Sequence, residues 1–284
     1  MEILSKDTIK TDILPNLSIG KRGLPVSEET RVAIVECILY KLKTGCQWAF
    51  VPVQQFVKEK DMTWQNIYYH FLKWSKEHLF FMLWISILKK YKKHLDLSCI
   101  QLDGSQTPCK KGGLAVGYQG RKHCKTTNML FLADNQGQML ACSPPQEGQH
   151  NDLYDIQKLF ESMCQMLEQA GLDTRFLFLN ADAGFDSKEF RQICKTKQIH
   201  ANIASNPRNS KQETDEIEYQ YFDEKLYKRR TVIEHANAWM DSLRTVLIRF
   251  ETLTVTWVSF IFLSFSVLFL RKLSRKKKFQ TKKC

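Results

Sequence analysis

The chain has 284 residues, enough for two domains with a full hydrophobic core, and its 42 Lys/Arg against 30 Asp/Glu give a net charge of +12. Nine cysteines without a Cys-x-x-Cys pair disfavour a zinc site or a disulfide framework, and reduced cytosolic thiols are the simplest account. The first residues lack the basic-then-apolar pattern of a signal peptide.

Positive charge is concentrated at the two ends of the chain. Residues 1–95 carry 15 Lys/Arg against 9 Asp/Glu, and residues 271–284 carry 8 against none, whereas residues 96–270 carry 19 against 21. Contacts to a DNA backbone are therefore expected at the ends, and metal chelation in the slightly acidic centre. A charged tail is nevertheless most often only a solvated tail.

Two helices are predicted near the start. Residues 28–43 place apolar side chains on one face, with Gly45 as the stop signal, and the face consists of Val32, Val35, Ile38, Leu39 and Leu42. A second helix starts with Thr63 as its cap and continues through Ser75, with an apolar stripe of Trp64, Ile67, Tyr68, Phe71 and Trp74. This second helix is a candidate DNA-groove reader. Because an aromatic stripe is more often core, only Gln65, Asn66 and Lys73 are predicted to face DNA.

The following region is predicted to alternate strands and helices. The expected strands are residues 98–103, 126–133, 138–143, 175–181 and 199–204, and the expected helices are 150–170, 187–196 and 224–248. Residues 205–222 are polar and predict a loop. The first strand would end at Asp103 and the fourth at Asp182, which brings two carboxylates to one edge of a sheet.

The helix predicted over 224–248 carries a third acidic residue. Tyr227, Arg230 and Glu234 stand at positions i, i+3 and i+7, so all three lie on one face. Asp103, Asp182 and Glu234 together suggest a metal-binding triad, because carboxylates are hard ligands that suit Mg²⁺. A pair of such ions can activate an attacking oxygen and stabilise a leaving oxygen of a phosphodiester. Arg230 would grip a phosphate beside this triad.

These segments resemble the RNase H-like DDE transposases of bacterial insertion sequences. The third segment of that family reads Tyr-x2-Arg-x3-Glu-x6-Lys, and Tyr227, Arg230 and Glu234 match it. Residues 181–186 resemble the family's Ala-Asp-Lys-Gly-Tyr-Asp segment, residues 148–152 its short His/Asp turn, and residues 117–122 the basic turn after its first strand. Residues 42–48 and 63–71 resemble the helical DNA-binding region of the insertion-sequence family-five group.

One position departs from the family pattern. The lysine expected seven residues after Glu234 is Asp241, and a carboxylate there would repel a DNA phosphate. Arg244, predicted one turn further along the same helix, would partly replace the lost charge. A derivative of a transposase that binds DNA without catalysis therefore remains an alternative.

The resemblance implies a small all-α, helix-turn-helix-like domain over 1–95, an RNase H-like mixed sheet with flanking helices over 96–270, and a basic tail over 271–284. It implies a transposase with endonuclease and strand-transfer activity that uses two Mg²⁺ or Mn²⁺ ions bound by the triad, and DNA as the partner of a homodimer. No small-molecule cofactor is expected. The DNA-binding residues would be Tyr227, Arg230, Arg244, Arg121, Lys122, Gln65, Asn66 and Lys73. The expected location is the cytoplasm, at the nucleoid, or the nucleus of a eukaryotic host.

Other acidic and apolar features have structural interpretations. Asp186 and Glu189 have the spacing of a helix cap and its capping glutamate, and His150 is expected to be a loop hydrogen-bonder. Residues 253–270 contain no charge over 18 residues and precede the basic tail, a pattern that a tail-anchored membrane protein would also show. We favour a buried helix here, because five Ser/Thr interrupt the segment and the family has an apolar helix that packs on its catalytic sheet.

Overall fold

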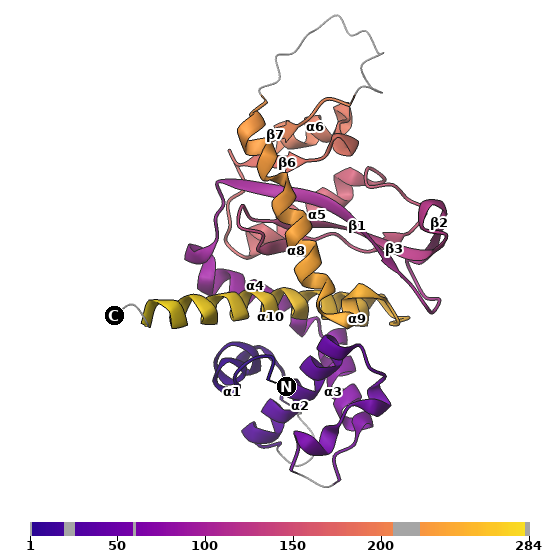
Figure 1. Ribbon diagram of the computed structural model, residues 1–284, viewed down its shortest axis with the longest axis vertical. Coiled ribbons are helices and arrows are strands. Elements are labelled where there is room, and N and C mark those ends of the chain that lie inside the picture. Colours follow the sequence, from indigo (N-terminus) through magenta and orange to yellow (C-terminus); the bar gives the residue numbers. More distant parts are fainter. Residues whose placement is uncertain (1, 20–25, 59–60, 207–221, 282–284) are drawn as a thin grey trace, which may run out of the picture. The chain divides into compact units, whose positions relative to one another are not determined.

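The computed structural model describes residues 2–19, 26–58, 61–206 and 222–281, with side chains as far as residue 276. The chain forms two compact units (Figure 1). The helical unit contains Met1–Ile87, Pro108–Leu114 and Trp239–Cys284. The sheet unit contains Leu88–Thr107 and Ala115–Ala238.

The helical unit starts with short turns and then its first long helix. These are α1 (Lys6–Thr8), a π turn (Ile9–Ile13), a 3₁₀ turn (Leu14–Asn16) and α2 (Glu28–Thr44). Ser27 caps α2 by accepting a hydrogen bond from the Thr30 backbone N–H at 3.1 Å, and Gly45 ends it with a φ of 68°. The predicted helix, its buried face and its glycine stop are therefore confirmed.

The second predicted helix is α3 (Trp64–Lys76), and α4 (Leu79–Tyr91) follows it. Ile67, Phe71 and Trp74 are buried as the apolar stripe predicts. Trp64 and Tyr68 lie on the predicted face of the helix as well, but they are only half-buried. Their side chains line a hollow in this unit instead of filling the core.

The apolar segment near the end of the chain belongs to α10 (Thr254–Thr281). Its Phe260 ring stacks on Phe71 of α3 at 4.4 Å, and Phe265 lies edge-on to Trp84 of α4 at 5.5 Å. Residues 254–276 are long and apolar enough to cross a membrane, but the most apolar window is 72% buried, as in a core helix. The helix packs on helices of its own unit, where the resemblance implied a sheet.

The sheet unit is built on one mixed sheet of seven strands. Their order is β2-β3-β1-β6-β7, and β4 and β5 also pair with β3. The strands are β1 (Cys99–Pro108), β2 (Gly117–Gln119), β3 (Cys124–Ala133), β4 (Met139–Cys142), β5 (Gln146–Glu147), β6 (Phe178–Ala181) and β7 (His200–Ile203). β1 and β7 each pair with β6 in parallel, whereas β2, β4 and β5 pair with β3 antiparallel. The mixed sheet and its flanking helices confirm the predicted α/β architecture of this part of the chain.

All five predicted strands are present, but β1 does not end where we expected. It continues five residues beyond Asp103, to Pro108. Hydrogen bonds from other segments hold Gln106 within this extension. Gln106 accepts a hydrogen bond from the Thr126 hydroxyl at 2.6 Å, and its carbonyl accepts one from Lys122 Nζ at 2.7 Å. Asp103 therefore lies within a strand.

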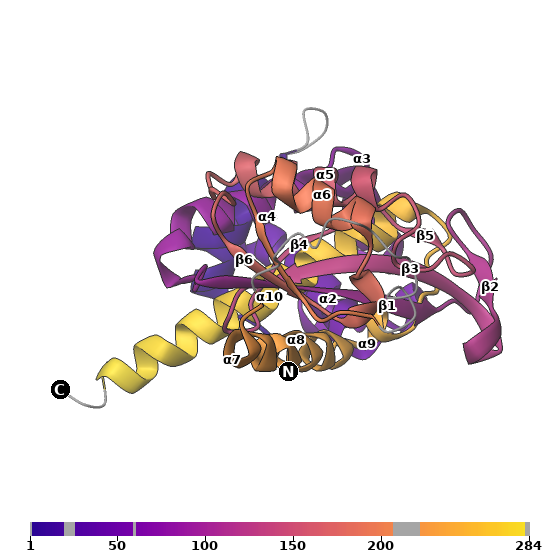
Figure 2. The same cartoon turned by 90° about the horizontal axis from the view of Figure 1, so that it is seen from above.

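Helices cover both faces of this sheet (Figure 2). On one face lie α5 (Ile156–Gln169) and α6 (Lys188–Thr196), joined by an edge-to-face contact of Phe160 and Phe190 at 5.2 Å. On the other face lie α7 (Glu224–Tyr227) and the start of α8 (Thr231–Asp241). The helix predicted at 150–170 starts later, at Ile156, and the one predicted at 187–196 is confirmed.

The single helix predicted over 224–248 is wrong. A 3₁₀ turn (Lys228–Arg230) separates α7 from α8, and α9 (Arg244–Leu247) follows a break at Leu243. Leu243 is fully buried in an extended conformation, and the Ser242 carbonyl accepts a hydrogen bond from Lys43 Nζ at 2.6 Å. These tertiary contacts replace the helical ones, so Arg244 is not on the Glu234 helix.

The two units divide the chain differently from the predicted domain boundaries. Residues from Trp239 onward group with the amino-terminal helices, because α10 supplies the aromatic side chains that α3 and α4 pack against. The basic end of the chain is also helical as far as Thr281. Most of the predicted loop 205–222 lies outside the described residues.

Candidate active site

Asp103 occupies the centre of β1, where the strand changes from buried to half-exposed. Its Oδ1 accepts a hydrogen bond from the Gly104 backbone N–H at 2.9 Å, and its Oδ2 accepts one from Asn237 Nδ2 at 3.1 Å. The second bond joins α8 to the middle strand of the sheet. Asn237 was not predicted as a site residue, although it stands one turn after Glu234.

Asp182 comes directly after β6, the parallel neighbour of β1. It caps a 3₁₀ turn (Ala183–Phe185) by accepting a hydrogen bond from the Gly184 backbone N–H at 2.8 Å. The pairing of β1 with β6 brings Asp182 close enough to Asp103 for their charges to repel. The juxtaposition expected from the sequence is therefore present.

A third carboxylate in this group, Asp152, was not predicted as a site residue. It accepts a hydrogen bond from Asn128 Nδ2 at 2.9 Å, and it lies against the backbone of Gly104. Burial and then repulsion by Asp182 raise the pKa of Asp152, whereas Asn128 and the charge of Arg121 lower it. We call Asp103, Asp152 and Asp182 the acidic cluster. The resemblance of residues 148–152 to a His/Asp turn was the signal that could have identified it.

Burial raises the pKa of Asp103 to about 6. The hydrogen bond from Gly104 opposes this rise, the charges of Asp182 and Asp152 add to it, and the charge of Arg230 lowers it. The three carboxylates of the acidic cluster are thus close together, and the charges of Arg230 and Arg121 do not fully neutralise them. This is the electrostatic condition that a bound cation would relieve.

Glu234 lies on α8, the helix that also carries Asn237, and Arg230 lies on the 3₁₀ turn before it. Arg230 Nη1 lies 3.3 Å from Glu234 Oε1, and 53% of the Glu234 side chain is exposed. Tyr227 is the last residue of α7. This helix is tied to the sheet by Asn180 of β6, whose Nδ2 donates a hydrogen bond to the Leu226 carbonyl at 2.8 Å. Tyr227, Arg230 and Glu234 thus follow one another on α7, the 3₁₀ turn and α8, and Arg230 forms an ion pair with Glu234.

The oxygen ligands present suit a hard divalent cation, and the unneutralised charge of the acidic cluster favours one. Among the described residues, however, no three acidic, cysteine or histidine side chains converge as a closed ligand set. Glu234 is engaged by Arg230, and Asp103 by Asn237. The donor chemistry of these carboxylates therefore suits a divalent cation, and release of Glu234 from Arg230 would add a further oxygen ligand.

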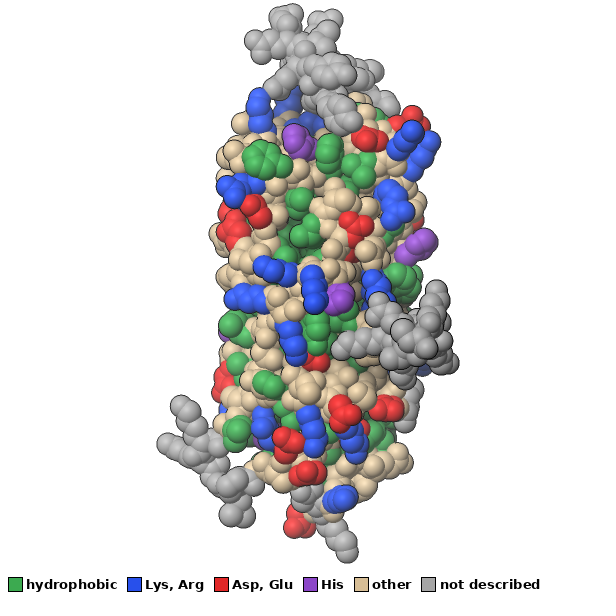
Figure 3. All heavy atoms as spheres, turned by 90° about the vertical axis from the view of Figure 1, so that its left-hand side faces the viewer, with side chains coloured by type: hydrophobic (Ala, Val, Ile, Leu, Met, Phe, Trp, Pro, Cys, Tyr) green, Lys and Arg blue, Asp and Glu red, His purple; other side chains and the backbone are tan. Residues whose placement is uncertain are grey.

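The other predicted DNA-binding residues are spread over both units. Arg121 and Lys122 lie exposed on a 3₁₀ turn (Gly120–Lys122) beside the cluster's sheet, whereas Gln65, Asn66, Lys73 and Arg244 belong to the helical unit. Asn66 has a structural task, since its Oδ1 accepts hydrogen bonds from the Thr63 N–H at 2.9 Å and the Thr63 hydroxyl at 2.8 Å. On the face in Figure 3, the basic side chains of the described residues lie among acidic ones. Their roles in DNA binding stay predictions.

The residues given structural interpretations behave accordingly. Asp186 pairs with Arg191 at 2.7 Å, but the cap of α6 is Ser187, so the predicted cap position is wrong by one residue. His150 stacks on Tyr154 with ring centroids 3.6 Å apart, and its carbonyl accepts a hydrogen bond from Asn128 at 3.3 Å.

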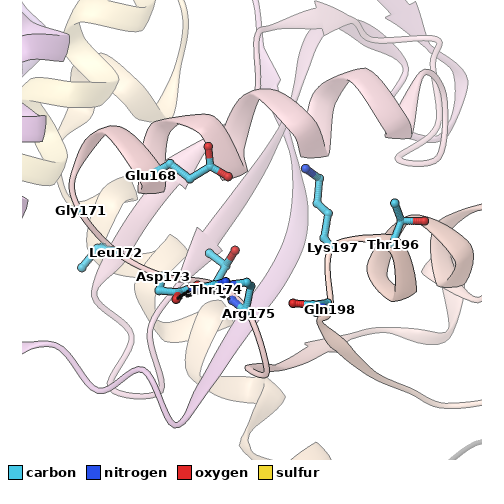
Figure 4. A pocket seen from close by; sticks show the side chains of 9 residues that line it. All are labelled: Glu168, Gly171, Leu172, Asp173, Thr174, Arg175, Thr196, Lys197 and Gln198. Atoms are coloured by element: carbon cyan, nitrogen blue, oxygen red, sulfur yellow. Dashed lines mark hydrogen bonds and ion pairs between the residues drawn. The ribbon is translucent and has the colours of Figure 1, made fainter.

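A hollow of about 560 Å³ in the sheet unit is distinct from the acidic cluster (Figure 4). Asp173 and Arg175 lie on one wall of it and form an ion pair at 2.7 Å, and Lys197, which also lines it, forms an ion pair with Glu161 at 2.6 Å. None of the predicted site residues lines it. Because its charged side chains are neutralised by these ion pairs, a substitution in this hollow can serve as a control for substitutions in the acidic cluster.

Asp103→Asn is expected to stabilise the metal-free protein above pH 6. The pKa of Asp103 is about 6 in the folded protein, against the usual 3.8 that applies to the unfolded chain. The stability that protonated Asp103 contributes is therefore full below about pH 4 and is lost as the pH rises through 6. Asparagine stays neutral and removes that loss, which amounts to at most roughly 2–3 kcal/mol. Denaturant unfolding with a chelator at pH 5 and pH 8 measures it, and the gain should be larger at pH 8.

Asp173→Asn is the matched control for that measurement. Its hydrogen bonds with Arg175 lower the pKa of Asp173 to about 2, so any stability it contributes is present above about pH 4 and is lost as the pH falls through 2. The control should therefore give no gain at pH 8. If Asp103→Asn raised the free energy of unfolding equally at pH 5 and pH 8, burial would not be the cause of the raised pKa of Asp103.

Comparison with known protein families gave a match over the region just described. The family of DDE superfamily endonucleases matches residues 100–251, more than half of the chain. A search of curated proteins gave no match. Among solved structures, the chain is similar to a Mos1 transposase paired-end complex with the left transposon end, at 10% identity and a TM-score of 0.29, over 82% of this chain and 83% of that one.

Proposed function

We propose that this chain, which belongs to the family of DDE superfamily endonucleases, is the DNA transposase of an insertion sequence that cuts DNA strands and joins them to a target. The observation that carries the proposal is the convergence of Asp103 and Asp182 on neighbouring strands, with Arg230 and Glu234 on the helical segment that covers the same sheet. Unneutralised carboxylates beside a guanidinium suit a reaction at a phosphodiester.

Asp103, Asp182 and Glu234 would hold two divalent ions, Mg²⁺ or Mn²⁺. Such ions, when bound, activate the attacking oxygen and stabilise the departing 3′ oxygen. Asn237 and the Gly104 N–H keep the Asp103 carboxylate in one orientation by their hydrogen bonds. Arg230 would exchange Glu234 for a phosphate oxygen of the DNA, and this exchange would free the Glu234 carboxylate.

The partner in this proposal is DNA, at the element ends and at the target, bound by a homodimer in the cytoplasm or at the nucleoid, or in the nucleus of a eukaryotic host. Arg121 and Lys122 would contact the backbone beside the cluster, Tyr227 would contact it or orient α7, and Gln65, Lys73 and Arg244 would contribute from the helical unit. The structural role of Asn66 makes it the weakest of the predicted contacts.

A strand-cleavage assay tests the proposal. The full chain is incubated with labelled duplex carrying the ends of its own element, with Mg²⁺, with Mn²⁺ or with a chelator. Cleavage that requires the divalent ion, followed by joining of the new 3′ end to a second duplex, is the expected result. Binding of the same DNA without cleavage under any metal condition would favour the derivative that binds DNA but lacks catalysis.

Asp241→Lys addresses that alternative. Asp241 is the exposed last residue of α8, seven residues after Glu234, so both lie on one face of this helix. A lysine there restores the charge of the family pattern and should raise DNA affinity and cleavage rate together, because it attracts phosphate where the carboxylate repels it. The cost to folding should be only a few tenths of a kcal/mol at an exposed site.

Side-by-side affinity and cleavage measurements on the two proteins decide the point. Equal or lower activity in the lysine variant would show that Asp241 is no handicap. Its present interactions would then be worth more than the restored charge.

A further inference from the structure

The helical unit contains a hollow of about 740 Å³ that lies wholly within that unit and shares no residue with the acidic cluster. Its lining comes from the end of α2 with the turn after it, the start of α3, Lys111 and residues 250–252. The first two are segments that the sequence analysis singled out and that the cleavage chemistry leaves without a task. The volume lies in the range of sites that bind small molecules or single groups.

Aromatic rings make up much of its wall. Trp48 lies 5.3 Å from Tyr68 between ring centroids, and Trp64, Phe50 and Phe250 line the hollow with them. The Phe50 side chain is 70% exposed and that of Phe250 is 47% exposed. Exposed rings that converge on one concave surface are typical of a binding site, whereas single exposed apolar side chains are ordinary.

A buried cation also lines the hollow. Lys41 is only 4% exposed, and its Nζ lies 4.0 Å from Glu251 Oε1, 5.8 Å from the centre of the Trp48 ring and 5.9 Å from that of Phe260. Its ion pair with Glu251 is therefore a long one. Among the described residues, Trp48 Nε1 is buried without a hydrogen-bond acceptor. The wall thus holds a buried cation with one long ion pair and a buried N–H donor without an acceptor.

We propose that this hollow binds an unpaired nucleotide of a DNA strand, an inference that rests on the proposed function. The base would stack on the Phe50 and Phe250 rings, and its polar edge would meet Lys41 as donor and Glu251 as acceptor. The exposed Lys111 at the rim would attract the attached phosphate. A paired base cannot enter, because both its faces and its edge are occupied in the duplex.

The test compares two DNA probes on the full chain, with a chelator present so that no strand is cut. One is a short blunt duplex, and the other is the same duplex with a single-stranded thymidine overhang. The overhang should bind more tightly, and Phe50→Ala and Phe250→Ala should each weaken overhang binding about 5- to 150-fold while leaving blunt-duplex binding unchanged. Fluorescence anisotropy measures all of these affinities.

Phe176→Ala is the matched control, since Phe176 is 67% exposed and lies in the sheet unit. It should leave both affinities as they are. Overhang and blunt probes that bind equally, or phenylalanine variants that weaken both alike, would overturn the proposal.

The proposed function is scored separately, by cleavage of duplex in the presence of Mg²⁺. Cleavage together with overhang binding that ignores Phe50 and Phe250 would defeat only the nucleotide site. Phenylalanine-dependent overhang binding without cleavage under any metal condition would defeat only the transposase proposal.

Discussion

Asp103→Asn, Asp182→Asn and Glu234→Gln are each expected to abolish DNA cleavage while sparing DNA binding. Each change removes one ligand charge from the proposed metal pair but leaves the basic ends of the chain intact. Because metal ions supply several kcal/mol of stabilisation to such a transition state, the rate should fall by roughly a thousandfold or more. Cleavage is measured with saturating Mg²⁺, and binding with a chelator present.

Asp173→Asn is again the control, because its carboxylate pairs with Arg175 in the separate hollow of the sheet unit. It should cut DNA at the normal rate. Full cleavage by any of the three variants would remove that residue from the site. Full cleavage by Glu234→Gln combined with loss in Asp152→Asn would instead make Asp152 the third ligand.

Gly104→Ala is expected to reduce cleavage strongly by displacing Asp152. A Cβ at position 104 would lie 2.4 Å from Cγ and Oδ1 of Asp152, far inside contact distance, and Asp152 is also tied to Asn128. The overlap forces the carboxylate away from the cluster or shifts β1 beside Asp103. The free energy of unfolding should fall by about 1–3 kcal/mol, the usual cost of overpacking, as measured by denaturant unfolding.

A double-mutant cycle separates the clash from other effects of the alanine. On an Asp152→Ala background the overlapping atoms are gone, so Gly104→Ala should cost much less stability there than in the parent protein. Gly120→Ala is the control, because a Cβ there meets no atom within 4 Å. If Gly104→Ala lowered the free energy of unfolding equally on both backgrounds, the overlap with Asp152 would not be the cause of its destabilisation.

The sequence by itself determined the local elements and part of the site. The helices α2 and α3 follow from apolar periodicity with capping and stop signals, and the strands from short apolar runs between turns. The approach of Asp103 to Asp182 could be predicted as well, because both follow buried runs that lie side by side in the sheet. These signals are local, so a single sequence carries them.

Only the tertiary structure decided which further groups join them. Asp152 enters the cluster because Gly104 leaves room and Asn128 holds it, and Asn237 reaches Asp103 across more than a hundred residues. The break at Leu243 arises because its side chain is buried. In each case a distant segment supplies the partner, and periodicity along the chain carries no information about such contacts.

The two aromatic residues of α3 that face the hollow show the same division. The sequence placed Trp64 and Tyr68 on the apolar stripe with Phe71, and helical geometry does put them there. Phe260 of α10 covers Phe71, whereas Trp64 and Tyr68 extend past it and line the hollow. Local spacing fixes which side chains share a face, but how far a neighbouring element covers that face depends on packing across the whole unit.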